Sequence, residues 1–310
     1  MKKILLPLTL SASLFAQYNF LLGDELDILG NYGKKTTKYV HITQKKPQIY
    51  YTLLPYIGII DYSGTTTKDH GNVGGIYLSA FESPWKVELD AEHTNIKYKY
   101  SIPKLKQTDL TAKINYYQGY NLAYNIGFHY IDTTDKPTDE AKIYMAGILY
   151  YKTLKYNAGV DIYYSDYSNL STSPKLYQIS PKAGFNFGNY SSAIGSFYAE
   201  AKIDYIAISK NKDENNLKNS YTSVELTLNN YNGNFTTSIS GWSGKRVYAV
   251  ENNGFVVNNL NNEQKYGFKI SENYKIDKAQ SVKIEYAHTK FEDNGDSKSN
   301  NIIANYSYNF

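Results

Sequence analysis

The chain has 310 residues, no cysteine, a formal net charge of +4 and 34 tyrosines. The absence of cysteine excludes disulfides, thiol chemistry and cysteine-based metal sites, and the small net charge gives no indication of a nucleic-acid partner. The mean hydropathy is −0.52, and after the first residues no apolar run approaches the ~20 residues of a membrane-spanning helix.

The N-terminus has the features of a secretory leader. Lys2 and Lys3 precede a short apolar stretch, which is followed by small residues. We predict a signal peptide over residues 1–16. Cleavage after Ala16 places a leucine three residues before the cut, whereas cleavage after Ser13 satisfies the small-x-small pattern, so both sites remain open.

Residues 17–50 lack the pattern of the segments that follow. The stretch 20–31 is compatible with a short amphipathic helix, and the polar run that ends at Pro47 interrupts regular structure. We predict that this segment is either a periplasmic lead-in to the folded domain or a plug that folds into it, and we favour the lead-in.

Between residues 51 and 310 the sequence alternates with a period of two. In the stretch 85–92, for example, Lys86 and Glu88 alternate with Val87 and Leu89. This pattern predicts strands with one apolar and one polar face. A soluble β-sandwich would alternate too, but these strands have about 10–15 residues, against a usual ~5–6, and satisfy the ~9–11 residues of a tilted membrane strand.

The links between the predicted strands alternate in length. The stretches near 51–62 and 139–151 alternate least clearly. Six short and seven long links predict about fourteen strands with both ends on the short-turn side. The short links are 82–84, 118–121, 152–155, 188–191, 232–233 and 277–279, and the long ones centre on 63–72, 99–107, 132–140, 166–174, 210–219, 249–264 and 292–299.

The chain ends in an alternating strand with aromatic residues on one face, at Tyr306, Tyr308 and Phe310. This strand resembles the last strand of Gram-negative outer-membrane β-barrels, which acts as the barrel-insertion signal. The resemblance covers residues 51–310 as a pattern rather than a motif. It implies an all-β fold: a transmembrane antiparallel up-and-down β-barrel with short periplasmic turns and longer extracellular loops. Outer-membrane lipid and the barrel-assembly machinery are the implied partners.

The polar face of these strands is expected to line the interior, because about fourteen strands lies nearer to an aqueous channel than to a filled barrel. The run Glu88, Asp90 and Glu92 is the best candidate for a cation-favouring wall; the alternative, which we favour, is that neighbouring lysines pair with it. The pore-lining candidates are Lys86, Glu88, Asp90, Glu92, Lys113, His129, Asp161, Lys182, Glu200, Lys202, Asp204, Glu225, Lys269, Lys283 and Glu285.

The charges of the two signs nearly cancel, so the expected function is passive, weakly selective diffusion of ions and small hydrophilic solutes. Arg246 is the only arginine, which excludes the arginine ladder of trimeric porins. The chain therefore resembles monomeric channels of the OmpG type. Fatty-acid transporters also have fourteen strands, but they are longer, and their Asn-Pro-Ala motif is absent from residues 17–50. The alternative function is a plugged barrel with a structural or adhesive role.

The link 249–264 contains an apolar patch, Phe255-Val256-Val257, between asparagines. Such a patch can contact a partner, fold into the pore mouth as a constriction, or extend a hairpin above the membrane. We expect the hairpin.

The sequence predicts no enzyme, no cofactor and no metal. No serine stands two residues after a histidine, as a barrel phospholipase requires, and Asp69 and His70 are adjacent rather than spaced as in omptin-type proteases. The inward His129 is expected to be a hydrogen-bonded wall residue, because no nucleophile, base and orienting group share a suitable spacing.

Overall fold

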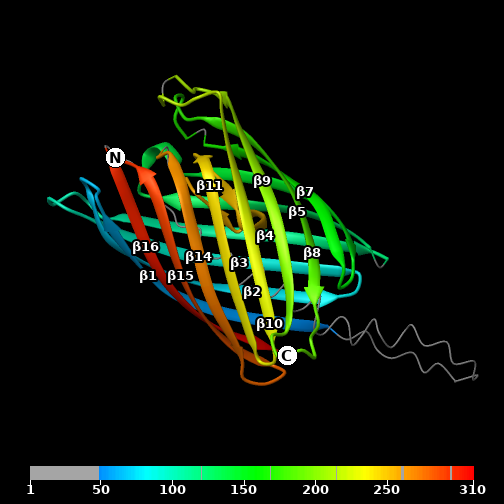
Figure 1. The fold of residues 1–310 in the computed structure, drawn as a ribbon. Helices are drawn as coiled ribbons and strands as arrows, with labels where there is room; N and C mark the ends of the chain where they lie inside the picture. The colour runs from blue at the N-terminus through cyan, green and yellow to red at the C-terminus, as the bar shows by residue number, and fades with distance from the viewer. Residues whose placement is uncertain (1–48, 120, 168, 214, 260–261, 294) are drawn as a thin grey trace, which may run out of the picture.

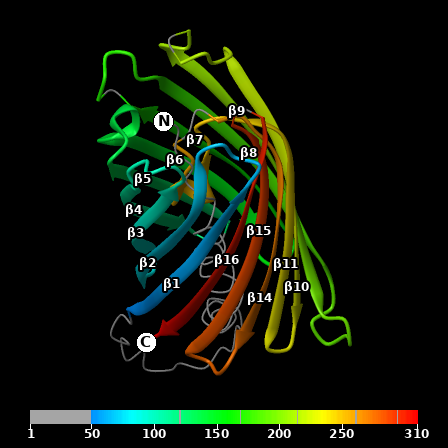
Figure 2. The ribbon, with the colours of Figure 1, turned by 90° about the vertical axis from the view of Figure 1, so that its left-hand side faces the viewer.

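The computed structural model describes residues 49–310 except 120, 168, 214, 260–261 and 294. Fourteen of its strands form a closed antiparallel barrel (Figures 1 and 2). The predicted leader, its cleavage site and nearly all of the predicted lead-in lie outside the described residues. Across the part that is described, no helix has the length and apolar character needed to cross a membrane.

The barrel runs up and down, and each strand pairs with its neighbours in the chain, except that β11 pairs with β14 across an insertion and β1 pairs with β16 to close the barrel. Its strands are β1 (Tyr50–Ser63), β2 (Lys68–Glu82), β3 (Trp85–Tyr98), β4 (Leu105–Gln118), β5 (Leu122–Thr133), β6 (Ala141–Lys152), β7 (Tyr156–Asp166), β8 (Lys175–Gly188), β9 (Ser196–Lys210), β10 (Ser220–Asn232), β11 (Phe235–Arg246), β14 (Gln264–Lys275), β15 (Gln280–Glu292) and β16 (Asp296–Asn309). A short helix, η2 (Lys136–Thr138), lies between β5 and β6.

The first and last strands close the barrel. Strand β1 pairs with β16 along most of its length. At the end of this seam the Tyr51 amide donates to the Phe310 carbonyl at 2.9 Å, and the Phe310 amide donates to the Tyr51 carbonyl at 3.0 Å. Closure leaves no sheet edge with unpaired amides, which is the requirement for strands that cross lipid.

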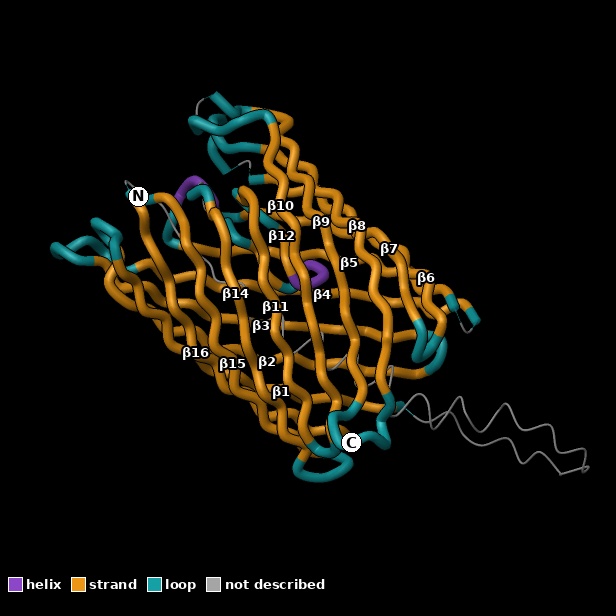
Figure 3. The backbone as a smooth tube through the Cα atoms, in the orientation of Figure 1, coloured by secondary structure: helices purple, strands orange, loops and turns teal. Residues whose placement is uncertain are grey.

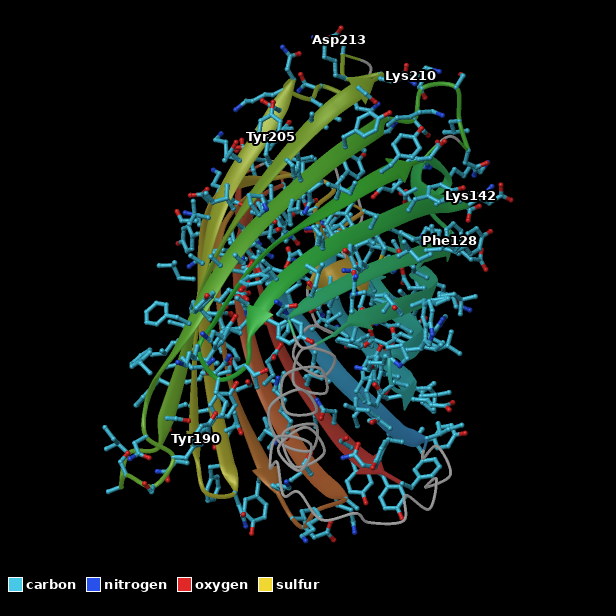
Figure 4. All side chains as sticks on the ribbon, turned by 90° about the vertical axis from the view of Figure 1, so that its right-hand side faces the viewer. Phe128, Lys142, Tyr190, Tyr205, Lys210 and Asp213 are labelled. Atoms are coloured by element: carbon cyan, nitrogen blue, oxygen red, sulfur yellow. The ribbon has the colours of Figure 1, made fainter. Side chains whose placement is uncertain are left out.

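The two ends of the barrel differ. The short links join the strands at one end, here called the short-turn end, and the remaining links lie at the other, the long-loop end. Figure 4 shows Tyr190 at the short-turn end and Lys210 and Asp213 at the long-loop end. The predicted strand number and the weakly alternating strands β1 and β6 are confirmed.

Two of the predicted long links are shorter than expected, and the predicted short link 188–191 extends over residues 189–195. Strands β1 and β2 continue until only residues 64–67 separate them, and β15 and β16 continue until only residues 293–295 do. His70 and Asn72 are exposed on β2 while Gly71 and Val73 are buried. The strand continues beyond the part of the barrel that has an apolar outer face. There the residues on both faces are mostly polar or small, so the sequence of the strand resembles that of a loop.

The outer face of the barrel is apolar, whereas the inner face carries the charged side chains together with two apolar clusters. On β3 the exposed side chains include Trp85, Val87 and Leu89, whereas Lys86 and Glu88 are buried. The same arrangement recurs on β10, where Val224, Leu226 and Leu228 are exposed. A protein that presents aliphatic side chains to its surroundings and encloses its charges has a face suited to lipid rather than water.

Candidate functional site

The candidate site is a segment that folds into the barrel after β11. Residues 247–259, here called the inward segment, contain β12 (Val250–Glu251), the short helix η3 (Asn252–Gly254) and β13 (Val256–Val257). Strands β12 and β13 pair as a small hairpin, and Figure 3 shows η3 inside the barrel. Our expectation of a hairpin above the membrane is wrong, and the alternative of folding into the lumen is the observed one.

The apolar residues of the inward segment explain its position. Phe255 is 3% exposed, and its ring meets Tyr77 of β2 edge to face with centroids 5.8 Å apart. Val250 and Val257 pack with residues of β5 to β9 in a second apolar cluster. In a hairpin above the membrane, the side chains of this apolar patch would be exposed to water. Inside the barrel they are buried, Phe255 against β2 and Val257 against β5 to β9.

Glycine at position 254 permits this close packing. Gly254 has a φ of +98°, a backbone region that side chains with a Cβ rarely adopt. A Cβ there would also collide with the thioether of Met145 on β6. The turn of the inward segment therefore needs both the conformational freedom and the small size of glycine.

Polar contacts tie the inward segment to two walls. On β8, the Gln178 amide accepts from the Val250 amide at 2.8 Å and donates to the Val250 carbonyl at 2.7 Å. The Lys182 ammonium donates to the Asn253 side chain at 2.8 Å, while Lys113 of β4 donates to the Asn253 carbonyl at 3.3 Å. The segment thus bridges the lumen from β8 to β4.

The contacts of Asn259 fix the returning end of the inward segment. The Asn259 amide donates to Gln107 of β4 and to Thr138 of η2, each at 3.1 Å. Beyond it, Glu263 forms ion pairs with Lys245 and, at 3.4 Å, with Lys218. Partial burial opposes ionisation of Glu263, but the hydrogen bond and charge of Lys245 outweigh it and hold the pKa of this carboxyl below its usual range.

Arg246 anchors the first end of the segment. Its side chain is fully buried, and its guanidinium lies 2.9 Å from Asp204, 3.0 Å from Glu225 and 3.3 Å from Glu251. It also stacks on Trp242, with its central carbon 4.3 Å from the ring centroid. One planar cation therefore joins β9, β10 and the inward segment, a geometry that suits arginine and not lysine.

A polar cavity lies between the inward segment and the short-turn end. It is open to solvent, and its walls come from β7 to β11, β14 and β15. Asn252 and Asn253 of the inward segment face it. The four half-buried residues among our pore-lining candidates, Lys182, Glu200, Lys202 and Lys269, line this cavity together with Asp161, Glu225 and Glu285.

The remaining pore-lining candidates also lie inside the barrel, all of them buried: Lys86, Glu88, Asp90, Glu92, Lys113, His129, Asp204 and Lys283. His129 is held between Thr111, 2.8 Å from its Nδ1, and Asp109, 3.0 Å from its Nε2. Placement inside the barrel is a fact of the fold, whereas contact with a permeating solute stays a prediction.

The acidic run on β3 divides into two environments. Glu88 pairs with Lys86 at 3.2 Å and accepts hydrogen bonds from Tyr77 and Asn115, each at 2.6 Å. Asp90 and Glu92, by contrast, have no ion pair with a lysine or arginine in the described part of the chain. Pairing with a neighbouring lysine therefore accounts for Glu88 alone.

Asp90 and Glu92 share one hydroxyl group. The Tyr56 oxygen lies 3.2 Å from Asp90 Oδ2 and 3.0 Å from Glu92 Oε2, and it can donate only one proton. Across the strand pair, Glu92 faces Asp109 of β4, so two buried carboxyl groups stand opposite each other. Like charges in this position oppose folding.

We expect Glu92→Gln to leave the barrel within about 1 kcal/mol of the wild-type stability, or to stabilise it, because it replaces a buried carboxyl group that has no ion pair by a neutral amide. The matched variant Glu88→Gln on the same strand should lose roughly 3 kcal/mol, because it removes the carboxylate that pairs with buried Lys86. Urea unfolding in detergent micelles measures both. Equal losses for the two variants would contradict the distinction.

Several site residues escape prediction from the sequence. Gln178, Asn253 and Tyr56 are ordinary residues in a polar pattern, and nothing near them in the chain marks their contacts. Arg246 does carry a signal, since it is the single arginine and directly precedes the insertion. Among the described residues no group of three potential metal ligands is close enough to hold an ion.

Comparison with known proteins gives similarity at the level of the fold. No protein-family model matches the sequence, and no curated protein matches it. The Ralstonia pickettii toluene transporter TbuX has a TM-score of 0.53 at 8% identity, with 86% of this chain and 90% of that chain covered. A bacterial polysaccharide outer-membrane secretin has a TM-score of 0.53 at 9% identity, with coverages of 84% and 98%.

The Pseudomonas putida toluene transporter TodX is more distant, with a TM-score of 0.47 at 10% identity and coverages of 86% and 89%. At such identities, similarity shows the fold and nothing finer. The closed fourteen-stranded barrel and its apolar outer face, together with this similarity of fold, make the chain an outer-membrane β-barrel protein.

Proposed function

We propose that this protein is a narrow, selective outer-membrane channel in which the inward segment sets the aperture. The observation that carries the proposal is the bridge from Gln178 and Lys182 on β8 to Lys113 on β4, which places residues 250–253 across the lumen. A barrel of this strand number would otherwise enclose a water-filled passage. A wide, weakly selective pore, as the sequence alone suggests, is harder to reconcile with this bridge.

The cavity supports the same proposal. Its lining of charged, hydroxyl and amide side chains suits a small hydrophilic solute. Its charged groups are of both signs and are largely paired, as Lys182 is with Asp161 at 2.7 Å and Lys202 with Glu225 at 3.1 Å. Paired charges give no uniform ring of one sign, so size and hydrogen bonding, rather than net charge, would select the solute.

Single-channel recording in planar bilayers tests the proposal. The wild-type barrel should give small, steady openings, and a variant with residues 250–258 replaced by a short Gly-Ser linker should conduct several-fold more, because the bridge across the lumen is gone. A matched control replaces residues 99–104, a link at the long-loop end that lies between β3 and β4, with the same linker and should conduct like the wild type.

Two results would contradict the proposal. Wild-type conductance as large as that of the linker variant would mean that the inward segment does not limit flow. Silence of both proteins, with the barrel folded and inserted, would favour the plugged barrel with a structural role, because removal of the segment would then fail to open a path.

A further inference from the structure

The outer wall of β6 to β9 carries an apolar groove that the lumen does not explain. It has an empty volume of about 880 Å³ and opens outward. Figure 4 looks onto this wall and labels Lys142, Tyr205 and Lys210 on it. The side chains that shape the groove are Tyr144, Ala146, Tyr164, Tyr177, Tyr205 and Ala207.

Strand register explains why the wall is hollow here. Tyr144, Tyr164 and Tyr177 lie side by side on β6, β7 and β8, with ring centroids 6.3 Å and 5.0 Å apart. The next position in this row, on β9, is Ala207, which pairs with Tyr177. The small alanine leaves a depression beside a wall of rings, and Ala146 extends the depression below Tyr144.

A charged row lies immediately beyond the tyrosine row, toward the long-loop end. Paired positions place Lys142, Asp166, Lys175 and Lys210 next to one another on β6 to β9. Lys175 contacts Asp166 at 2.8 Å and Lys210 is exposed, so the β8–β9 half of the row carries excess positive charge. The β5–β6 half is different, because acidic residues at 132, 139 and 140 surround Tyr130, the neighbour of Lys142.

We propose that this groove binds one acylated, phosphate-bearing lipid of the outer leaflet. An acyl chain lies in the depression against the tyrosine rings, and a head-group phosphate contacts Lys175 and Lys210. On the other side of the tyrosine row, Ala146, Ile162 and Ile179 form an aliphatic row on β6 to β8. The order aliphatic, tyrosine, lysine matches the order of acyl chains, interface and head groups in a membrane. The occupant is a lipid because the groove is continuous with the lipid-facing surface of the barrel. The site does not depend on whether the lumen conducts.

Native mass spectrometry of the full-length folded protein in detergent tests the proposal, with bisphosphorylated lipid A as the probe and the same lipid without phosphates for comparison. We expect a one-to-one complex with the phosphorylated lipid and about tenfold weaker binding of the phosphate-free form. The double variant Lys175→Gln/Lys210→Gln should lose about the same factor. Lys142→Gln, on the acidic half of the row, should bind like the wild type.

A second pair of variants tests the apolar part of the site. Ala207→Leu fills the depression and should weaken binding of both lipids, whereas Ala201→Leu changes an exposed alanine on the same strand outside the groove and should have no effect. Equal binding of the two lipids to the wild-type protein would overturn the proposal without any variant. Normal lipid binding by Ala207→Leu would also overturn it. If the wild-type protein forms a dimer and Ala207→Leu is a monomer that still binds lipid, the groove belongs to a contact with a second copy of the chain.

Discussion

We expect the Arg246→Ala variant to lose about 3–5 kcal/mol of unfolding free energy, because the change leaves buried acids without their shared cation. Asp204, Glu225 and Glu251 all lie within 3.3 Å of the guanidinium. Lys202 pairs with Glu225 at 3.1 Å and lies 3.7 Å from Asp204, so it compensates part of this charge, but it does not contact Glu251. Urea unfolding of the barrel in micelles measures the loss.

The same variant should release the inward segment, because Glu251 of that segment loses its attachment to β11. Limited proteolysis checks this result: cleavage within residues 250–258 should become faster, and single-channel openings should become larger and less steady. Arg246→Lys should give an intermediate effect, since an ammonium group cannot contact three carboxylates with the geometry of a planar fork.

Lys245→Ala is the matched control for Arg246→Ala. Lys245 precedes Arg246 on β11 but lies on the outer face, exposed, with Glu263 as its partner. Pairs of this kind contribute little to stability. If Arg246→Ala unfolds at the same urea concentration as this control, the buried arginine is not the anchor of the segment.

Deletion of Phe310 should lower the amount of protein in the outer membrane several-fold while changing folding in detergent only slightly. The expectation rests on the resemblance of the last strand to the insertion signal of outer-membrane barrels. In the structure Phe310 is 62% exposed, and its ring stacks on Tyr51 with centroids 5.4 Å apart. Its loss removes the final backbone pair of the seam, but β1 and β16 remain paired over the rest of their length.

Cell fractionation with heat-modifiable gel mobility separates insertion from folding in this experiment. Phe310→Tyr keeps an aromatic side chain and should restore outer-membrane levels. Phe187→Ala removes another exposed aromatic near the short-turn end, away from the C-terminus, and should leave the levels unchanged. Normal outer-membrane levels after deletion of Phe310 would remove the C-terminal aromatic residue as an insertion signal in this chain.

The strands and their faces could be predicted because the information is local. A period of two is visible within one strand, so the inward position of Lys113 or Glu225 and the outward position of Leu226 need no knowledge of neighbours. To predict the number of strands, it was enough to recognise the turn residues between the alternating segments. The predicted links 63–72 and 292–299 were too long for a local reason as well. Where a strand extends beyond the lipid, both of its faces are polar, and the period of two no longer shows in the hydrophobicity of the sequence.

The site could not be predicted, because its contacts join distant parts of the chain. Whether a carboxyl group on β3 finds a lysine or another acid depends on strand register, which places Lys113 opposite Glu88 and Asp109 opposite Glu92. The apolar patch 255–257 left entry into the lumen as one of three alternatives, and only the contacts from Lys113, Gln178 and Lys182 on β4 and β8 decide for it. Only the isolated Arg246 hinted at a buried anchor.

The contacts of the inward segment also constrain the order of assembly. Val250 meets Gln178 across 72 residues, and Asn259 meets Gln107 across 152. Contacts between such distant positions form slowly, because the intervening chain must first be ordered. We therefore expect residues 247–259 to take their place only after β4 to β8 stand as a wall, so that the loop enters and narrows the lumen late in assembly.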